Sequence, residues 1–241
     1  MNFADLFSRH KRATLLYSGG KDSLACLLLL ADWWHQVDVV WVDTGNQFPE
    51  VYEHMDRVRG LVPTFITIKS NTYEFTRDHG YPVDVVPTRY TTTGQFIYGP
   101  KKFRVCSRFD CCRNNIWKPI EDYVRLTKPT CIIRGDRSSE RMKAPESIEG
   151  IEFAFPLFDW TTDQVMNLIR NAPFGLFQER HNLPEGSSLD CISCMAYNVE
   201  HESRMEYLKK HHSLIYKGAV EFFKDYKNAV KEEMAELGDK E

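Results

Sequence analysis

Short apolar runs alternate along the first two thirds of the chain with longer stretches whose apolar residues recur at helical spacing. The first run ends in Ser-Gly-Gly and precedes the apolar stretch Leu24–Trp34, and the second ends in Asp-Thr-Gly and precedes Phe48–Leu61. These boundaries predict strand, loop and helix in turn. Strands that alternate with helices favour an α/β fold with a doubly wound, mostly parallel sheet. The predicted strands are Thr14–Tyr17, Val37–Val42, Phe65–Ile68 and Cys131–Ile133.

The loops after three of these strands carry polar and glycine residues. They open at Ser18, Asp43 and Gly135. Doubly wound sheets bind their ligands beyond the carboxyl ends of the strands. We therefore expect the three loops to share one edge of the sheet.

Two later regions have a different pattern. Tyr81–Pro100 is rich in Thr, Pro and Gly and has no helical period, which predicts a loop or flap. Beyond Cys194 an apolar stripe at steps of three and four predicts a long helix, which either folds back on its own domain or forms a homo-oligomer interface. The expected domains are an α/β domain over residues 1–198 and a helical extension over 199–241. The stripe consists of Ala219, Phe222, Phe223, Tyr226, Val230, Met234 and Leu237.

Composition narrows the function only slightly. A net charge of -3 argues against nucleic-acid binding by bulk electrostatics but leaves a local basic patch open. The longest apolar run, Leu24–Ala31, is too short to cross a bilayer, so we expect a cytoplasmic protein without membrane contact. Seven cysteines and no secretory signal favour metal ligands, redox groups or core residues over disulfides.

The first glycine-rich turn has the composition of an anion site. A turn between a buried strand and a helix points free backbone N–H groups and the positive helix end at an anion. The lysine adds a positive charge, the serines add hydroxyl donors, and the aspartate is a candidate magnesium ligand or helix cap. An ordinary glycine-rich turn is the alternative, and the glycine-to-lysine spacing excludes a Walker A loop. The residues are Ser18, Gly19, Gly20, Lys21, Asp22 and Ser23.

The cysteines form two close pairs, the adjacent Cys111 and Cys112 and the CxxC pair Cys191 and Cys194. Adjacent cysteines suit a 4Fe–4S cluster, whose irons occupy separate corners, better than a tetrahedral zinc ion. Zinc and unliganded thiols remain alternatives. Cys106 lies among basic residues that would lower its pKa, which makes it a candidate nucleophile. The other two cysteines, Cys26 and Cys131, are expected in the core.

Several of these motifs resemble those of one family. The SGGKDS string resembles the PP-loop of the ATP pyrophosphatase superfamily, and Asp43–Glu50 resembles the DTG-x-x-FPE segment of phosphoadenylyl-sulfate (PAPS) reductases. Pro156–Val165 is similar to the family's PL-x-x-WT-x-x-DV stretch, and the CC…CxxC arrangement to the cluster-bearing adenylyl-sulfate (APS) reductases. The resemblance implies an adenine nucleotide alpha hydrolase-like fold with a 4Fe–4S cluster. It also implies that residues 1–198 form a nucleotide-binding domain with a four-cysteine metal site. The residues that it implies bind the nucleotide are Ser18, Gly19, Gly20, Lys21, Asp22, Ser23, Asp43, Thr44, Gly135, Arg137 and Arg141.

The resemblance implies a reductase that converts adenylyl sulfate or its 3'-phosphate form to sulfite, with a thiol reductant such as thioredoxin as partner. Members of the family carry a nucleophilic cysteine in a Glu-Cys-Gly-x-His segment, but no cysteine follows Cys194 here, so the catalytic residue is unassigned. An ATP-dependent sulfur-transfer enzyme acting on nucleic acid, with Mg²⁺ accompanying ATP, is the first alternative. A catalytically silent nucleotide-binding subunit is the second.

Overall fold

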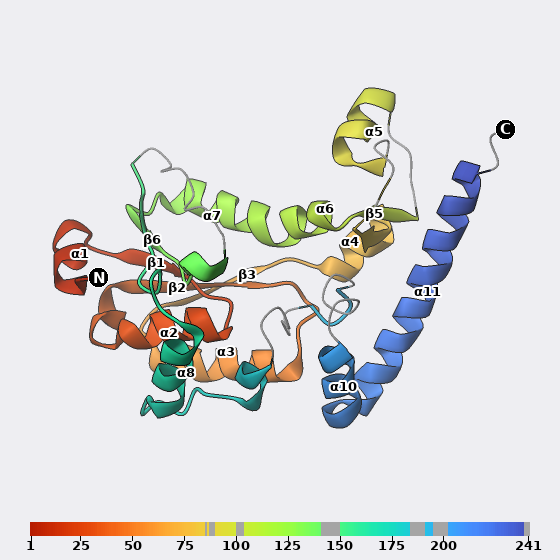
Figure 1. Ribbon diagram of the computed structural model, residues 1–241. Coiled ribbons are helices and arrows are strands. Elements are labelled where there is room, and N and C mark those ends of the chain that lie inside the picture. The colour runs from red at the N-terminus through yellow and green to blue at the C-terminus, as the bar shows by residue number, and fades with distance from the viewer. Residues whose placement is uncertain are drawn as a thin grey trace. The chain divides into compact units, whose positions relative to one another are not determined.

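The computed structural model describes residues 1–84, 86, 90–99, 104–140, 150–183, 191–194 and 202–238 (Figure 1). The chain divides into two compact units, which are described separately here. The first unit consists of residues 1–42, 49–68 and 120–182, and the second of residues 43–48, 69–119 and 183–241.

The first unit is built on a five-stranded sheet with the order β3-β2-β1-β6-β7. The pairs β1–β2, β1–β6 and β6–β7 are parallel, with Leu15 opposite both Val39 and Ile133. Three of the four apolar runs that predicted strands form the central strands β2, β1 and β6, and the fourth forms the edge strand β3. The prediction of a doubly wound parallel sheet is confirmed. The strands are β1 Ala13–Leu16, β2 Val37–Asp43, β3 Phe65–Lys69, β6 Cys131–Ile133 and β7 Glu152–Ala154.

Helices cover both faces of this sheet. Figure 1 shows α7 above the strands and α2, α3 and α8 below them. The residues Leu24–Leu28 of α2 are all buried, and α2 packs against α8. A helix buried on every side has no polar stripe, which explains the unbroken apolar run in the sequence. The helices are α1 Phe3–Arg9, α2 Lys21–Leu29, α3 Pro49–Leu61, α7 Lys118–Thr127 and α8 Thr162–Asn171.

The predicted helix Leu24–Trp34 is shorter than expected. It ends at Leu29, and the 3₁₀ turn η1, Ala31–Gln36, follows. The indole Nε1 of Trp34 donates a hydrogen bond to the carbonyl of Leu27 at 2.8 Å. This contact folds the aromatic end of the segment back over the last turn of α2. The other 3₁₀ turns of the first unit are η4 Ser138–Glu140 and η5 Glu179–Asn182.

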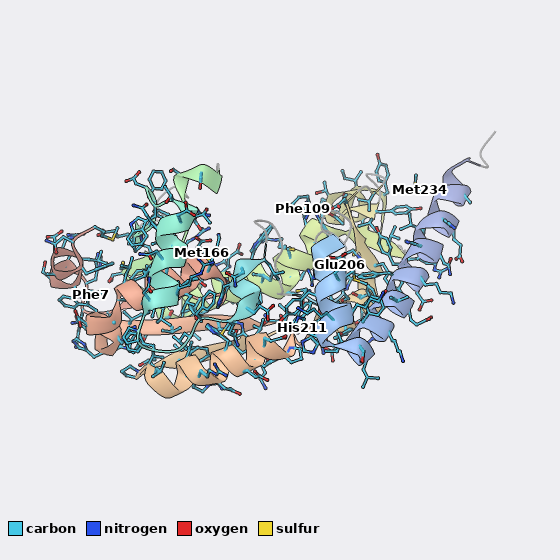
Figure 2. The ribbon with its side chains drawn as sticks, turned by 60° about the horizontal axis from the view of Figure 1, so that its bottom comes forward. Phe7, Phe109, Met166, Glu206, His211 and Met234 are labelled. Carbon is cyan, nitrogen blue, oxygen red and sulfur yellow. The ribbon has the colours of Figure 1, made fainter. Side chains whose placement is uncertain are left out.

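The second unit contains a small parallel sheet, β4–β5, and helices from both halves of the chain. Val83 of β4, Val105 of β5 and Ala229 of α11 form a buried cluster together with Tyr90. The C-terminal helix thus packs back onto its own unit, as one of the two interpretations of its apolar stripe predicted. Figure 2 labels His211 on α10 and Met234 on α11. The elements are α4 Thr72–His79, β4 Tyr81–Val83, α5 Thr92–Tyr98, β5 Val105–Ser107, α6 Arg108–Cys112, the π-helical turn η3 Arg113–Trp117, α10 Glu202–His211 and α11 Ser213–Gly238.

The prediction of a loop over Tyr81–Pro100 was wrong for two segments, which form β4 and α5. The side chain of Thr91 caps α5 by accepting a hydrogen bond from the N–H of Gly94 at 3.1 Å. The apolar residues of α5 are exposed, with Phe96 91% exposed, so the helix has no buried stripe to reveal its period. Residues 85, 87–89 and 100 of this segment lie outside the described residues. Among the described residues, no helix is long and apolar enough to cross a membrane.

Candidate functional site

A cavity opens in the first unit beyond the carboxyl ends of β1 and β6. In the sheet, β1 lies between β2 and β6. The chain adds β2 and β3 on one side of β1 and later adds β6 and β7 on the other side, so the direction of strand addition reverses at β1. This switch point is where doubly wound sheets bind ligands. The structure thus brings the loops at Ser18 and Gly135 together as predicted. The cavity is lined by Leu16, Ser18, Asp22, Ser23, Arg134, Gly135 and Asp136.

The loop between β1 and α2 has the local geometry of an anion site. Gly19 has a φ of 77°, which favours glycine, and a Cβ there would stand 2.6 Å from Cε of Met55. Gly20 is the N-cap of α2, and no side chain caps that helix. The first amides of a helix have no acceptor within the helix. The hydroxyls of Ser18 and Ser23 lie 3.1 Å apart at the same turn.

Gly135 is required by a close approach of two backbones. A Cβ at this position would stand 2.9 Å from the carbonyl carbon of Asp22 and 3.1 Å from the backbone nitrogen of Ser23. The loop after β6 therefore packs directly against the first turn of α2. Any side chain at Gly135 would push the two loops of the cavity apart.

The charged side chains of the site largely pair with one another. Lys21 Nζ lies 2.5 Å from Asp22 Oδ2, and Arg137 Nε lies 2.9 Å from Asp22 Oδ1. Arg137 is only 1% exposed and also donates to Thr162 Oγ1 at 2.9 Å, and it does not line the cavity. Its predicted contact with the nucleotide remains a prediction. Arg141 lies outside the described residues.

Two basic residues that the sequence analysis did not select contact the loop from inside the protein. Arg180 Nη2 donates to the carbonyl of Gly19 at 2.8 Å, and His181 Nε2 lies 3.2 Å from the same oxygen. The N–H of Gln178 donates to Nδ1 of His181, so Nε2 carries the proton. Burial, and then the charge of Arg180, lower the pKa of His181 to about 4. Arg180 and His181 lie about 160 positions after Gly19 in the chain. The sequence pattern around them therefore does not indicate that they contact the loop.

The Asp-Thr-Gly loop, Asp43–Phe48, belongs to the second unit, and β2 ends at Asp43 as predicted. Within that unit Thr44 Oγ1 lies 3.6 Å from Cys191 Sγ. Asn46 Nδ2 donates to Ser193 Oγ at 2.5 Å, and the backbone N–H of Ile192 donates to the carbonyl of Asn46 at 2.8 Å. The loop thus holds the CxxC segment in place, a contact that the sequence did not reveal. The roles of Asp43 and Thr44 in nucleotide binding remain predictions.

The two cysteine pairs meet at one cavity of the second unit. Cys111 and Cys112 end α6, and Cys191 and Cys194 come from the short segment 191–194. Asn115, 4% exposed, donates through Nδ2 to the carbonyl of Cys111 at 3.0 Å and to its sulfur at 3.7 Å. The sequence analysis predicted that the four cysteines belong to one site, and they line one cavity here. Its walls are Asn46, Thr72, Thr76, Pro82, Arg108, Cys111, Cys112, Asn115, Ile116, Cys191, Ser193, Cys194 and Phe222.

The environment of Cys111 and Cys112 favours the protonated form of their thiols. Burial, followed by the neighbouring cysteines, raises the pKa of Cys111 to about 12. Burial and Cys194 raise the pKa of Cys112 as well, against the charge of Arg108. Among the described residues, no group of three or more His, Cys, Asp or Glu side chains is arranged to hold a metal ion. The four cysteines line one cavity, and the 4Fe–4S cluster expected on them remains a prediction.

The expectation that basic neighbours lower the pKa of Cys106 was wrong. Cys106 is 4% exposed in β5, and its thiol donates to the carbonyl of Gly80 at 3.3 Å. Burial, and then the charge of Asp110, raise its pKa to about 12. Desolvation disfavours the thiolate more than the basic residues can stabilise it. Cys26 and Cys131 are buried, as predicted.

The comparison with protein families decides the classification. Residues 12–174 match the model of the phosphoadenosine phosphosulfate reductase domain. The chain belongs to this family. The matched residues include the PP-loop, the Asp-Thr-Gly loop and the adjacent cysteines, whereas Arg180, His181 and the CxxC pair follow the matched segment.

Two solved structures are similar to this family member. One is phosphoadenylyl-sulfate reductase from Candida auris in a phosphate complex, with 19% identity, a TM-score of 0.45, and 65% of this chain and 71% of that chain covered. The other is a predicted subunit of tRNA methyltransferase from Methanocaldococcus jannaschii, with 13% identity, a TM-score of 0.37, and 66% and 74% covered. The comparison with curated proteins gave no significant match.

Proposed function

We propose that this family member is a sulfonucleotide reductase that binds adenylyl sulfate or its 3'-phosphate form on the PP-loop and carries a 4Fe–4S cluster on Cys111, Cys112, Cys191 and Cys194. One observation carries the cluster part of the proposal. All four cysteines of the two pairs line a single cavity, although 78 residues separate the pairs in sequence. Family membership supports the sulfonucleotide part.

The proposed reaction is a two-electron reduction at sulfur. Two thiols of the reductant give up two electrons and two protons and become a disulfide, and the bond between sulfur and the phosphate oxygen breaks. Sulfite leaves together with adenosine 5'-phosphate, or with the 3',5'-bisphosphate when the substrate carries a 3'-phosphate. The backbone amides at the start of α2 would hold the phosphate, because Asp22 and Ser23 of this first turn line the cavity and no side chain caps the helix. Ser18 and Ser23 would add hydroxyl donors on the same side.

The four thiols are also suited to binding the cluster. Burial and the neighbouring cysteines raise the pKa of Cys111, and coordination by iron would replace the proton of its thiol. A bound cluster would supply iron ions that hold the cysteines as thiolates beside an electron-accepting centre. Asn115 and Thr44 would donate hydrogen bonds to the sulfurs of Cys111 and Cys191.

Anaerobic purification followed by iron, sulfide and zinc analysis tests the cluster. We expect about four irons per chain, and we expect Cys194→Ser to lower the iron content. Cys26→Ser is the matched control, because Cys26 is buried elsewhere and donates to the carbonyl of Arg134. Zinc in place of iron, after reconstitution with iron and sulfide, would overturn the cluster assignment.

Sulfite release from adenylyl sulfate in the presence of thioredoxin tests the reaction on the same sample. The result expected is sulfite formation that depends on the reductant. The absence of sulfite in a sample that holds iron and binds nucleotide would overturn the reductase assignment. It would leave an ATP-dependent sulfur-transfer enzyme and a catalytically silent nucleotide-binding subunit as the remaining functions.

One observation favours a second candidate function, ATP-dependent sulfur transfer. No cysteine lies between Cys194 and Glu241, and the remaining thiol with basic neighbours, Cys106, is buried with a raised pKa. A sulfur-transfer enzyme would instead activate its acceptor with ATP and release pyrophosphate. Pyrophosphate release from ATP and Mg²⁺ in the presence of nucleic acid, without sulfite from adenylyl sulfate, would favour this function.

A further inference from the structure

The carbonyl of Gly19 accepts two hydrogen bonds from side chains behind the PP-loop. Arg180 Nη2 and His181 Nε2 approach the same oxygen at 2.8 Å and 3.2 Å. Both side chains are buried, with Arg180 8% and His181 5% exposed. A loop carbonyl that receives two donors from one helical turn is fixed in direction.

The direction of this carbonyl determines the direction of the next amide. In a trans peptide the C=O of Gly19 and the N–H of Gly20 point to opposite sides. With the carbonyl turned inward, the N–H of Gly20 points to the Ser18 side of the loop, where it lies 3.3 Å from Ser18 Oγ. Ser18 is part of the cavity wall.

The two donors are themselves held in place. Arg180 Nε donates to Gln178 Oε1 at 2.6 Å, and the N–H of Gln178 donates to His181 Nδ1 at 2.9 Å. The amide of Gln178 is held in turn, because its Nε2 donates to the carbonyl of Glu50 at 3.2 Å. The turn η5 thus carries two donors, Arg180 and His181, that contact Gln178 and bond to the carbonyl of Gly19.

We propose that Arg180 and His181 are positioning residues of the nucleotide site, which set the Gly19–Gly20 peptide so that the PP-loop amides face the phosphate. The inference rests on the nucleotide-binding part of the proposed function. Arg180 fixes the direction of the Gly19 carbonyl. Its buried positive charge behind the loop also makes anion binding at the adjacent amides more favourable.

Calorimetric titration of the full chain with inorganic pyrophosphate tests this role. We expect Arg180→Met to weaken binding about tenfold or more, because the loop loses a donor and a charge. Loss of the neutral donor in His181→Leu should weaken binding several-fold. His181→Gln places an amide donor near the position of Nε2 and should restore most of the affinity.

Arg170→Met is the matched control. Arg170 Nη2 donates to Asn182 Oδ1 at 2.7 Å, at the end of the same turn, but does not contact Gly19. A general loosening of η5 would weaken pyrophosphate binding in this variant as well, and such a result would overturn the positioning role. Equal affinity of His181→Leu and the wild type would overturn it too, even if Arg180→Met fails to fold. If the wild type itself does not bind pyrophosphate, the nucleotide site falls together with this inference.

Discussion

Arg137 and Asp22 form a buried ion pair at the first turn of α2, with Nε and Oδ1 2.9 Å apart. The arginine side chain is 2% exposed and the aspartate 19%. Because the carboxylate lies beside the proposed phosphate site, its charge would repel the ligand if nothing balanced it. Arg137 and Lys21 provide that balance, so the arginine supports the anion site through Asp22.

Replacing Arg137 by Met should destabilise the protein by about 1–3 kcal/mol, because Asp22 and Thr162 each lose a buried partner while Lys21 still pairs with the carboxylate of Asp22. Urea unfolding of the full chain measures this loss. Arg77→Met is the control, since Arg77 pairs with Asp78 at the surface and is 69% exposed. That variant should lose less than about 1 kcal/mol. Equal losses in the two variants would contradict a structural role for the buried pair.

Gly135→Ala should destabilise the first unit by about 1–3 kcal/mol and weaken pyrophosphate binding, because its Cβ would meet the backbone of Asp22 at 2.9 Å. Gly60→Ala in α3 is the opposite case. Nothing lies within 4 Å of the Cβ at that position, so alanine should stabilise the helix by about 0.5–1 kcal/mol. Thermal unfolding of both variants and calorimetry with pyrophosphate measure the contrast. An alanine tolerated equally at both positions would show that the two loops can separate freely.

Acid should destabilise the protein through two buried histidines. Burial and the charge of Arg180 lower the pKa of His54 to about 2 and that of His181 to about 4, whereas an unperturbed histidine has a pKa of 6.5. As the pH falls below 6.5, the unfolded chain binds protons that the folded chain does not, so stability decreases. Between pH 6 and 4 these residues contribute a slope of up to about 2.7 kcal/mol per pH unit.

Removal of one of these histidines tests the origin of the slope. We expect His54→Gln to reduce the number of protons taken up on unfolding in acid by about one. The pH dependence of the unfolding free energy measures this number. His35→Gln is the control, because His35 is exposed. An unchanged slope in His54→Gln would mean that other groups cause the acid sensitivity.

Asn46→Ala should loosen the CxxC segment. Asn46 is 3% exposed, and its amide joins Ser193 Oγ to the hydroxyl of Tyr73, which donates to Oδ1 at 2.6 Å. Loss of these two contacts should cost about 1–3 kcal/mol, because each hydrogen bond contributes about 0.5–1.5 kcal/mol net. Hydrogen exchange should become faster at Ile192, whose N–H bonds to the carbonyl of Asn46. Asn114→Ala, at an exposed amide of η3, should leave this exchange unchanged.

Local sequence pattern was sufficient for the strands β1, β2, β3 and β6 and for the PP-loop, but it did not reveal β4, β5 and β7. The β-branched and apolar runs at β1, β2 and β6 are continuous because both faces of the sheet are covered. The glycines at 19 and 20 stand where a strand turns into a helix, so their role is also visible locally. The helix α5 was missed because its apolar residues are exposed and leave no period.

The sequence by itself determined the parallel α/β sheet, the glycine-rich turn and the existence of two cysteine pairs, because these depend on residues close together in the chain. Tertiary structure alone decided that the pairs share one cavity, that Arg137 binds Asp22, and that Arg180 and His181 hold Gly19. It also decided that the pKa of Cys106 is raised, because the effect of burial is larger than the opposite effect of the basic residues near it in sequence. Charge and spacing can be read along the chain, but desolvation and long-range hydrogen bonds depend on which segments pack together.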